Sequence, residues 1–268
     1  MPMVMPVLTM LLREINVTNK KGSSYDIAKA LLDHYHEIPN RTIHEMADEC
    51  YISSASLSRF IRTIGFDHYT DFKEACRKEI GIEVDYSKDV SKASIDDMRP
   101  IIERYTESIK HNIDYTYQQM DFSQLERICK MMFEAKEIAF FGLEFAMLLG
   151  QHFQVKMASM NKLVRLGLTY EEQKEIAQQL PEHALVFVAS LEGGYFYRND
   201  EVMNIFQQKH VTIVAMTMNE NTKMTKDIDE ILICNKVNSN TEGRITLLYM
   251  IEILLMYYFV NYQMYHME

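Results

Sequence analysis

The sequence predicts a two-domain protein, in which an all-helical N-terminal domain precedes an α/β domain built on a parallel sheet of five strands. Three observations support this fold class. The first 80 residues show only helical apolar spacing, residues 81–100 are polar and end in Pro100, and beyond them short apolar runs alternate with helical stretches. A polar segment poor in large aliphatic residues is typical of a linker. Continuous apolar strands that alternate with helices indicate a parallel sheet covered on both faces.

The expected domain boundaries follow from these changes of pattern. Residues 1–82 form the helical domain, residues 83–104 form the linker and a connecting helix, and residues 105–268 form the α/β domain. A chain of 268 residues that is 47% hydrophobic can bury a core in each of two domains.

Helix start signals define the first elements of the N-terminal domain. Ser23 or Ser24 can cap a helix whose apolar residues follow helical spacing. Thr42 and Glu45 form a capping box, in which each side chain satisfies a free backbone N–H at the helix start. The short helix that follows is expected to end near Cys50.

Two further helices complete this domain. Ser53 can cap the first of them, and Gly65 stands where a left-handed residue would end it. An amphipathic helix is expected over residues 69–80.

The α/β domain is predicted from short apolar runs bounded by turn residues. The expected strands are residues 137–141, 163–166, 184–189, 211–216 and 230–234. The helical stretches between them include residues 145–160, 170–180 and 198–208.

Residues 50–66, CYISSASLSRFIRTIGF, contain no acidic residue, although the chain carries 38 of them and a net charge of −10. Two short helices joined by a brief turn predict a helix-turn-helix here. One face of the second helix is apolar and would pack inward: Leu57, Phe60, Ile61 and Ile64. The opposite face is small near its start and basic later: Ala55, Ser58, Arg59 and Arg62.

This second face suits the major groove of DNA. Small side chains permit close approach, and carboxylates would be repelled by phosphates. Arg59 or Arg62 could read a guanine edge, while the free N–H groups of residues 53–56 could hold a phosphate. From the charge pattern alone, the solvated face of an ordinary amphipathic helix remains an alternative.

Residues 42–73 resemble the helix-turn-helix of the RpiR family of bacterial transcriptional regulators. The family pattern is T-I-x-E-L-A, a hydrophobic residue and Ser, a small-residue stretch ending in Arg-Phe, then Gly-Phe, Tyr and Phe-Lys. It falls on Thr42, Ile43, Glu45, Ala47, Ile52, Ser53, Arg59, Phe60, Gly65, Phe66, Tyr69, Phe72 and Lys73. Met46 replaces the usual Leu and preserves side-chain volume. Together with the exposed face, the resemblance implies these DNA-binding residues: Thr42, Ser53, Ser54, Ala55, Ser56, Ser58, Arg59, Arg62, Tyr69 and Lys73.

The same resemblance implies that the C-terminal part is a sugar isomerase (SIS) domain, a flavodoxin-like fold that binds a phosphosugar effector. A ligand of such a sheet lies at the carboxyl ends of the strands. There the family's Gly-x-Gly-x-Ser reads GLEFA at residues 142–146, and its Ser-x-Ser-Gly-x-Thr reads SLEGGY at residues 190–195. The expected effector-binding residues are Gly142, Glu144, Phe145, Ser190, Glu192, Gly193, Gly194, Tyr195 and Glu242.

Three interpretations of this pocket stay open. Glu144 and Glu192 would repel a phosphate dianion, so the pocket could take a cationic, amino-bearing or unphosphorylated ligand. It could instead hold a phosphosugar through Ser190 and backbone N–H groups, with both glutamates turned outward. Third, it could be an unliganded dimerisation scaffold. Glu242 stands near the place where isomerases of this fold carry a catalytic acid or base, but the preferred explanation is an acid favoured by the helix dipole.

The leading functional hypothesis is a homodimeric or homotetrameric regulator of sugar metabolism genes that binds a partly palindromic double-stranded operator. An isomerase with an added helical domain is the first alternative, although the loop that should grip phosphate is altered. A protein-binding module is the second. The last helix is expected to supply subunit contacts through Leu247, Ile251, Leu254, Leu255 and Tyr258.

No cofactor, metal or membrane is expected. The four cysteines, Cys50, Cys76, Cys129 and Cys234, lie far apart without metal-ligand spacing, which favours reduced thiols in the cytoplasm. The N-terminus lacks the basic region and cleavage site of a secretory signal. The apolar run at residues 245–260 is interrupted by Glu252 and is shorter than the roughly 20 residues of a membrane span. It predicts a buried or interface helix.

Overall fold

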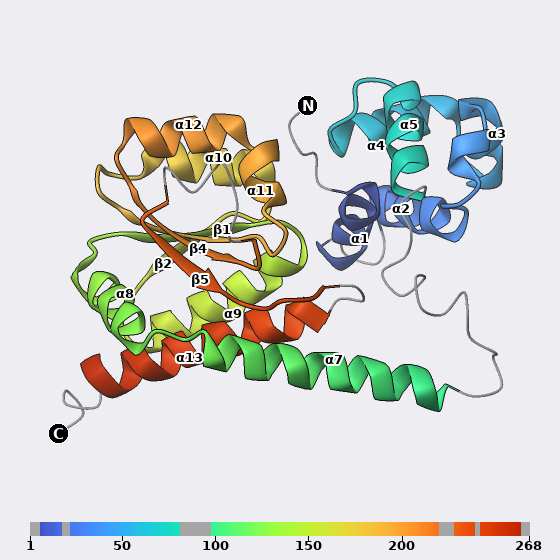
Figure 1. The fold of residues 1–268 in the computed structure, drawn as a ribbon. Helices are drawn as coiled ribbons and strands as arrows, with labels where there is room; N and C mark the ends of the chain where they lie inside the picture. The colour runs from blue at the N-terminus through green and yellow to red at the C-terminus, as the bar shows by residue number, and fades with distance from the viewer. Residues whose placement is uncertain (1–5, 18–21, 81–97, 220–227, 239–241, 264–268) are drawn as a thin grey trace. The chain divides into compact units, whose positions relative to one another are not determined.

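The computed structural model describes residues 6–17, 22–80, 98–219, 228–238 and 242–263. They form two compact units, one up to residue 80 and one from residue 98 (Figure 1). Most of the expected linker, residues 83–104, lies outside the described residues. Its last part belongs to helix α7 (Arg99–Gln118), which begins with Pro100 in its first turn and continues past residue 105 without a break.

The N-terminal unit is helical throughout its described residues. Its elements are α1 (Val7–Val17), α2 (Ser23–Asp33), the 3₁₀ turn η1 (Ile38–Asn40), α3 (Ile43–Glu49), α4 (Ser54–Thr63) and α5 (Tyr69–Ile80). They pack around one apolar core, in which Leu11, Leu31, Met46, Leu57 and Phe72 are inaccessible to solvent. Both the all-helical class and the extent of α5 are confirmed.

The caps of this unit are mostly those that the sequence predicts. Thr42 and Glu45 form the capping box of α3, and the Ser53 hydroxyl accepts a hydrogen bond from the N–H of Ser56 at the start of α4. Gly65 follows α4 with a φ of +100°. The prediction for α2 is wrong, because Ser23 is already helical and Gly22 is the N-cap residue.

The C-terminal unit contains the predicted parallel sheet. The strands are β1 (Ile138–Gly142), β2 (Val164–Leu166), β3 (Leu185–Ala189), β4 (Thr212–Thr217) and β5 (Glu230–Ile233), in the order β2-β1-β3-β4-β5 with every pair parallel. The helices after α7 are α8 (Phe122–Glu134), α9 (Phe145–Ser159), α10 (Tyr170–Gln179), α11 (Gly194–Arg198), α12 (Asp200–Gln208) and α13 (Glu242–Tyr262). This strand order is that of the flavodoxin-like fold.

Helices cover both faces of the sheet (Figure 1). Successive side chains of a strand point to opposite faces, so β3 sends Leu185 and Phe187 toward α8, α9 and α13. It sends Val186 and Val188 toward α10, α11 and α12. All five residues of β3 are buried, which explains why the strand reads as one continuous apolar run.

Helix α13 is longer than the apolar run that predicts it. It spans 21 residues, and within the described residues it is the one helix long and apolar enough to cross a membrane by length and composition. The apolar run at residues 245–260 therefore belongs to a helix that is long enough for a span, contrary to the expectation from its length. Burial is the better criterion, because Leu247, Ile251 and Leu254 are almost fully buried in the core beneath the sheet. A core helix of a globular protein passes the same length test.

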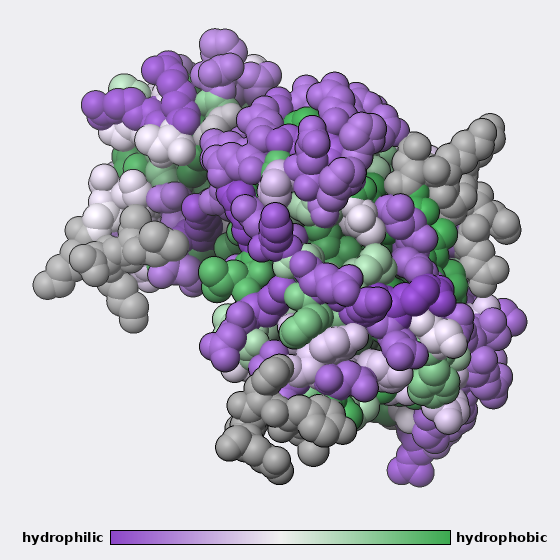
Figure 2. Space-filling view, turned by 90° about the vertical axis from the view of Figure 1, so that its left-hand side faces the viewer, coloured by the Kyte–Doolittle hydropathy of each residue, from purple (hydrophilic) through white to green (hydrophobic). Residues whose placement is uncertain are grey.

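The five expected contact residues of α13, Leu247, Ile251, Leu254, Leu255 and Tyr258, are buried in the core of their own unit and are not free to contact another subunit. Exposed apolar side chains lie elsewhere on the helix, among them Leu248, Met256 and Phe259. On the molecular face drawn in Figure 2, hydrophilic side chains cover most of the surface, and hydrophobic ones appear between them in patches.

All four cysteines are buried free thiols. Burial raises the pKa of Cys50 to about 11 and the pKa of Cys76 and Cys129 to about 12. Protonated, inaccessible thiols react slowly. No group of three or more His, Cys, Asp or Glu side chains suited to a metal ion occurs in the described ranges.

Candidate DNA-binding and effector sites

Helix α4 has the two faces that the sequence predicts. Leu57, Phe60 and Ile61 are buried against the other helices of the unit. Ala55, Arg59 and Arg62 are exposed, and the serines between them are partly exposed: Ser54, Ser56 and Ser58. The face that could contact DNA thus carries two guanidinium groups and small hydroxyl side chains.

The two arginines contact serines of their own helix. Arg59 Nη2 lies 3.4 Å from Ser56 Oγ, and Arg62 Nη2 lies 3.4 Å from Ser58 Oγ. These contacts are long for hydrogen bonds and lie on an exposed surface, so they do not bind the side chains firmly. Both guanidinium groups can turn toward an incoming phosphate or base.

The N-terminal end of α4 also meets helix α3. His44 Nδ1 lies 2.9 Å from Ser54 Oγ, so an exposed imidazole stands beside the first turn of α4. His44 is not among the DNA-binding residues that the sequence predicts. No local pattern in the sequence indicates a DNA-binding role for this residue. Only the packing of α3 against α4 brings it to this site.

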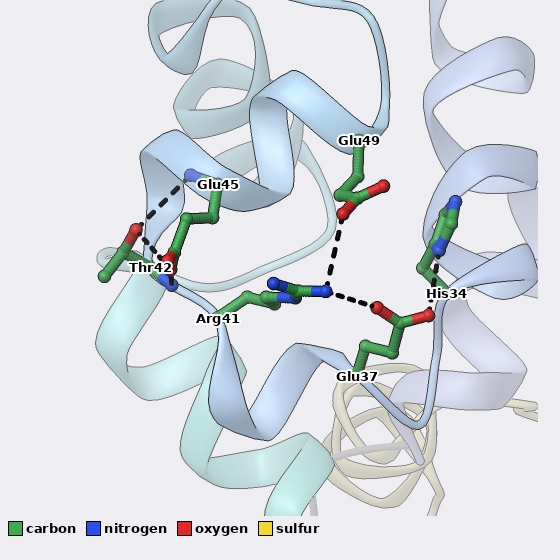
Figure 3. A network of polar contacts seen from close by, with 6 residues as sticks. All are labelled: His34, Glu37, Arg41, Thr42, Glu45 and Glu49. Atoms are coloured by element: carbon green, nitrogen blue, oxygen red, sulfur yellow. Dashed lines mark hydrogen bonds and ion pairs between the residues drawn. The ribbon is translucent and has the colours of Figure 1, made fainter.

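A polar network sets the position of α3 (Figure 3). Arg41, just before the helix, contacts Glu37 at 3.0 Å and Glu49 at 3.4 Å. It thereby links the turn before α3 to the end of α3. The Thr42 hydroxyl and N–H both meet the carboxylate of Glu45, and these hydrogen bonds lower the pKa of that carboxyl group. The predicted contact residue Thr42 is therefore also the cap of α3.

Tyr69 and Lys73 lie on α5. The Tyr69 hydroxyl donates a hydrogen bond to the carbonyl of Arg41 at 3.2 Å, and burial raises the pKa of Tyr69 to about 12. Tyr69 therefore connects α5 to the turn before α3. Lys73 is partly exposed, and its charge contributes to the lowered pKa of Glu45, which places both near the start of α3.

The second candidate site lies at the carboxyl ends of β1 and β3. These ends are neighbours, because Gly142 of β1 pairs with Ala189 of β3. Gly142 has no room for a side chain, since a Cβ there would lie 2.8 Å from Cβ of Ala146. The parallel register thus brings together the two loops that the sequence separates by nearly fifty residues.

The loop at residues 190–194 is held in a fixed shape. The Ser190 hydroxyl accepts a hydrogen bond from the N–H of Tyr195 at 3.0 Å. The carbonyl of Leu191 accepts from the Thr217 hydroxyl at 2.9 Å and from the N–H of Met218 at 2.8 Å. Gly193 has a φ of +80°, a conformation that favours glycine. The Ser190 proton remains available to a ligand.

The side chain of Tyr195 does not lie among the ligand groups of this loop, contrary to its place in the expected effector set. It is fully buried, and its hydroxyl donates to Gln173 Oε1 at 2.8 Å. Gln173 in turn donates through Nε2 to the carbonyl of Gly142 at 2.9 Å. Burial raises the pKa of Tyr195 well above its ordinary value. Gln173 therefore joins both loops, a role that has no local signal in the sequence.

The three expected glutamates have different surroundings. Glu144 is exposed with a φ of +42°. Glu192 is exposed and accepts a hydrogen bond from Asn238 Nδ2 at 3.2 Å. Glu242 is only 2% exposed and accepts from the Ser108 hydroxyl of α7 at 2.9 Å. Glu242 thus lies inside the unit, between α7 and α13.

A cation that is not among the site residues predicted from the sequence lies beside this loop. The guanidinium of Arg244, in the first turn of α13, lies 5.2 Å from the ring centroid of Phe145. Phe145 directly follows Glu144 at the start of α9. The contact is within the range of a cation–π interaction and brings a positive charge beside the loop at residues 142–145.

Comparisons with known proteins agree with this architecture. Residues 9–82 match the helix-turn-helix domain of the rpiR family. An HTH-type transcriptional regulator of Haemophilus influenzae is 25% identical over 246 residues, which cover 86% of this chain and 82% of the relative. The regulator HexR of Escherichia coli is 28% identical over 150 residues, 53% of this chain and 48% of HexR.

Solved structures show the same fold. The Vibrio vulnificus NanR protein complexed with ManNAc-6P aligns over 97% of this chain and 94% of its own, with 16% identity and a TM-score of 0.55. The sugar isomerase domain of an RpiR transcription factor from Sphaerobacter thermophilus aligns over 61% of this chain and 91% of its own. Its identity is 15% and its TM-score 0.52.

The helix-turn-helix with a basic exposed face, followed by a sugar-isomerase-type α/β unit, defines a DNA-binding transcriptional regulator. More narrowly, the helix-turn-helix at residues 9–82 is of the rpiR type. The resemblance that residues 42–73 indicate is confirmed, and so is the predicted fold of both units.

Tyr51, in the turn between α3 and α4, has an unusual backbone conformation. Its φ is +55°, and its side chain is 97% exposed, so no packing within the unit compensates for the conformation. A side chain in the left-handed region costs roughly 1–2 kcal/mol, whereas glycine adopts it freely.

We therefore expect Tyr51→Gly to stabilise the N-terminal unit by about 0.5–1 kcal/mol, after the greater backbone entropy of glycine in the unfolded chain is subtracted. Urea unfolding followed by circular dichroism measures this change. Tyr51→Ala is the matched control, because it removes the ring but keeps Cβ, and it should give no such gain. Equal stability of the two variants would show that the turn is not strained.

Proposed function

We propose that this regulator controls genes of sugar metabolism, binds a partly palindromic operator through α4, and takes a sugar phosphate as effector in its C-terminal unit. It acts as a homo-oligomer in the cytoplasm and is not an enzyme. The exposed, acid-free face of α4 is the observation that carries the DNA-binding part. The match of residues 9–82 to the rpiR helix-turn-helix domain supports it, and so do the relatives, which are named transcriptional regulators.

In the proposed complex the N-terminal half of α4 enters the major groove. Ala55 and the neighbouring serines permit close approach, and Arg59 and Arg62 contact bases or phosphates. Thr42 and Ser53 contact the DNA backbone from the starts of α3 and α4, and Lys73 contacts it from the N-terminal half of α5. His44 joins them, because it is exposed beside the start of α4.

Replacement of Arg59 or Arg62 by Ala is expected to weaken binding to an operator selected from random-sequence duplexes by about 1–3 kcal/mol where the arginine reads a base. Replacement of an arginine that contacts phosphate should instead weaken binding to all DNA sequences alike. It should also lower the slope of log affinity against log salt concentration by about one. Fluorescence anisotropy at several salt concentrations distinguishes the two roles. Lys78→Ala, which removes an exposed cation from the end of α5, is the matched control. Undiminished operator binding by the Arg59 and Arg62 variants would refute this docking mode.

The loops at residues 142–145 and 190–194 support an anionic rather than a cationic effector. Glu192 is engaged by Asn238, which draws its carboxylate toward the segment before α13. Arg244 brings a positive charge beside Phe145, where Glu144 alone would repel phosphate. Ser190 can donate its hydroxyl proton to a phosphate oxygen. The fold neighbour NanR was solved with ManNAc-6P, which agrees with this ligand class.

Phosphorylated sugars are accordingly expected to raise the melting temperature more than their unphosphorylated parents. Saturation a hundredfold above Kd stabilises the native state by about 2.7 kcal/mol. The panel is N-acetylmannosamine 6-phosphate, glucose 6-phosphate and fructose 6-phosphate, with each parent sugar and inorganic phosphate. Ser190→Ala should lower the affinity for the sugar phosphate that gives the largest shift by roughly threefold to tenfold, because one hydrogen bond is lost. Ser159→Ala is the control, because Ser159 is the last residue of α9 and lies at the end opposite to the loop at residues 142–145. A shift produced only by an unphosphorylated amino sugar would overturn the proposal and favour Glu144 and Glu192 as anchors.

An isomerase activity has less support. The carboxylate of Glu242 is buried and bonded to Ser108, whereas a catalytic base must reach the proton that it abstracts. Turnover of aldose or ketose phosphates that disappears in Glu242→Gln would reverse this conclusion.

Subunit contact is proposed for one exposed apolar surface of the C-terminal unit, the α9–α13 face. Its residues are Leu148 and Val155 of α9 with Leu248, Met256 and Phe259 of α13. His152 Nε2 contacts Glu252 Oε1 between the two helices, so both sets of side chains lie on the same side. Exposed apolar patches of this kind favour association, and closed two-fold dimers are the commonest oligomers.

Met256→Asp is expected to shift the protein from dimer toward monomer in sedimentation velocity, because a carboxylate in an apolar interface is left without water or a partner. Met256 is 58% exposed, so the unfolding temperature of the monomer should change little. Leu163→Asp alters a side chain that is 82% exposed before β2 and serves as the control. A dimer that survives Met256→Asp and Phe259→Asp together would place the interface elsewhere.

A further inference from the structure

One segment of the C-terminal unit, residues 234–238 between β5 and α13, is bonded to a single stripe of helix α7. Ser108, Asn112 and Thr116 follow one another at intervals of four residues, so they lie on one face of that helix. Thr116 donates its hydroxyl proton to the carbonyl of Cys234, and Ser108 donates to Glu242 at the start of α13. The stripe therefore contacts both ends of the connection between β5 and α13.

Asn112 makes the central contact. Its side chain is fully buried, and Nδ2 donates to the carbonyl of Val237 at 2.7 Å. Its Oδ1 accepts from the N–H of Val237 at 3.1 Å and from that of Lys236 at 3.3 Å. One carboxamide thus pairs with three backbone groups of the segment, and the carbonyl of Val237 also accepts from Asn235 Nδ2 at 2.8 Å. A shift of this segment must either carry α7 along or break these hydrogen bonds.

The same segment reaches the effector loop. Asn238 Nδ2 donates to Glu192 Oε1, and Asn238 Oδ1 accepts from the N–H of Gly243 at 3.2 Å. Gly243 packs so tightly that a Cβ would lie 2.6 Å from Asn235 Nδ2 and 2.9 Å from Asn238 Oδ1. This close packing leaves little room for movement where the effector loop, residues 234–238 and α13 meet.

Helix α7 is the first described helix that follows the N-terminal unit along the chain. A contact path therefore leads from the effector loop through Glu192, Asn238 and the segment to Asn112 on this helix. Glu192 is exposed at the proposed site, and sugar hydroxyls are hydrogen-bond donors that would compete with Asn238 for its carboxylate.

We propose that residues 234–238 couple the effector loop to α7, so that a change at Glu192 alters α7 through Asn112 and thereby alters DNA affinity. This regulatory role rests on the proposed function. Coupling of this kind requires a ligand that favours one arrangement of the segment over another. Competition for Glu192 supplies that difference.

Amide hydrogen exchange of the full chain tests the coupling without DNA or effector. Glu192→Ala should raise exchange in residues 108–118 of α7 at least about threefold. The matched control is Glu175→Ala, which removes an exposed carboxylate from α10 and should leave α7 unchanged. An α7 unaffected by Glu192→Ala would overturn the coupling.

A double-mutant cycle then tests the role of Asn112. In an Asn112→Ala background Glu192→Ala should produce no further change in α7, because the connection is already broken. Thr116→Val, nearly the same shape, takes its place where Asn112→Ala does not fold. Additive effects of the two changes would assign their action to separate causes and overturn the path through Asn112.

The selected operator supplies the functional readout. Glu192→Ala should change operator affinity at least about threefold, and the control Glu175→Ala should not. Coupled exchange with unchanged affinity would refute the regulatory role alone. A protein that selects no operator fails the proposed function, while the exchange experiment still decides whether the loop and α7 are coupled.

Discussion

Burial of the parallel sheet on both faces is the constraint on which the C-terminal unit depends. Strands such as β3 are apolar along their whole length, so helices must cover each side and every connection must cross over the sheet. All turns from strand to helix then meet at one edge. The loops that follow Gly142 and Ala189 become neighbours for this reason alone, and Gln173 holds them together from α10.

Helix α13 serves this sheet and also presents a second surface. Apolar side chains are distributed around the whole helix, although less than half of its most apolar stretch is buried. The structure separates the two roles by position. Leu247, Ile251 and Leu254 fill the core beneath the sheet, while Leu248 and Met256 remain exposed beside α9. The helix that stabilises the fold is therefore also the one available for association.

Among the described residues, five exposed side chains other than glycine have a positive φ, and two of them, Tyr51 and Glu144, lie at the candidate sites. Tyr51 stands in the turn of the helix-turn-helix, and Glu144 stands at the start of α9 beside the candidate effector site. Neither gains packing in return, since both are exposed. Such positions concentrate at functional sites, where a side chain is retained for what it contacts. The surroundings of both residues agree with that interpretation.

The sequence by itself determined the two fold classes, the five strands and the caps of α3 and α4. These depend on signals within a few residues, such as the Thr42 and Glu45 pair or an unbroken apolar run. It also placed Arg59 and Arg62 on the exposed face of α4, since helical spacing is a local property. Only the tertiary structure decided which side of α13 is buried, because its spacing is apolar on every side.

Long-range contacts decided the rest of the sites. Tyr195 lies in the core, where its hydroxyl donates a hydrogen bond to Gln173, twenty-two residues earlier in the chain. Glu192 meets Asn238, and Asn112 meets the segment before α13, across separations that no local pattern records. A hydrogen bond between distant residues depends on how the sheet and helices pack. The sequence therefore determined which elements form, and the tertiary structure decided which side chains those elements bring together.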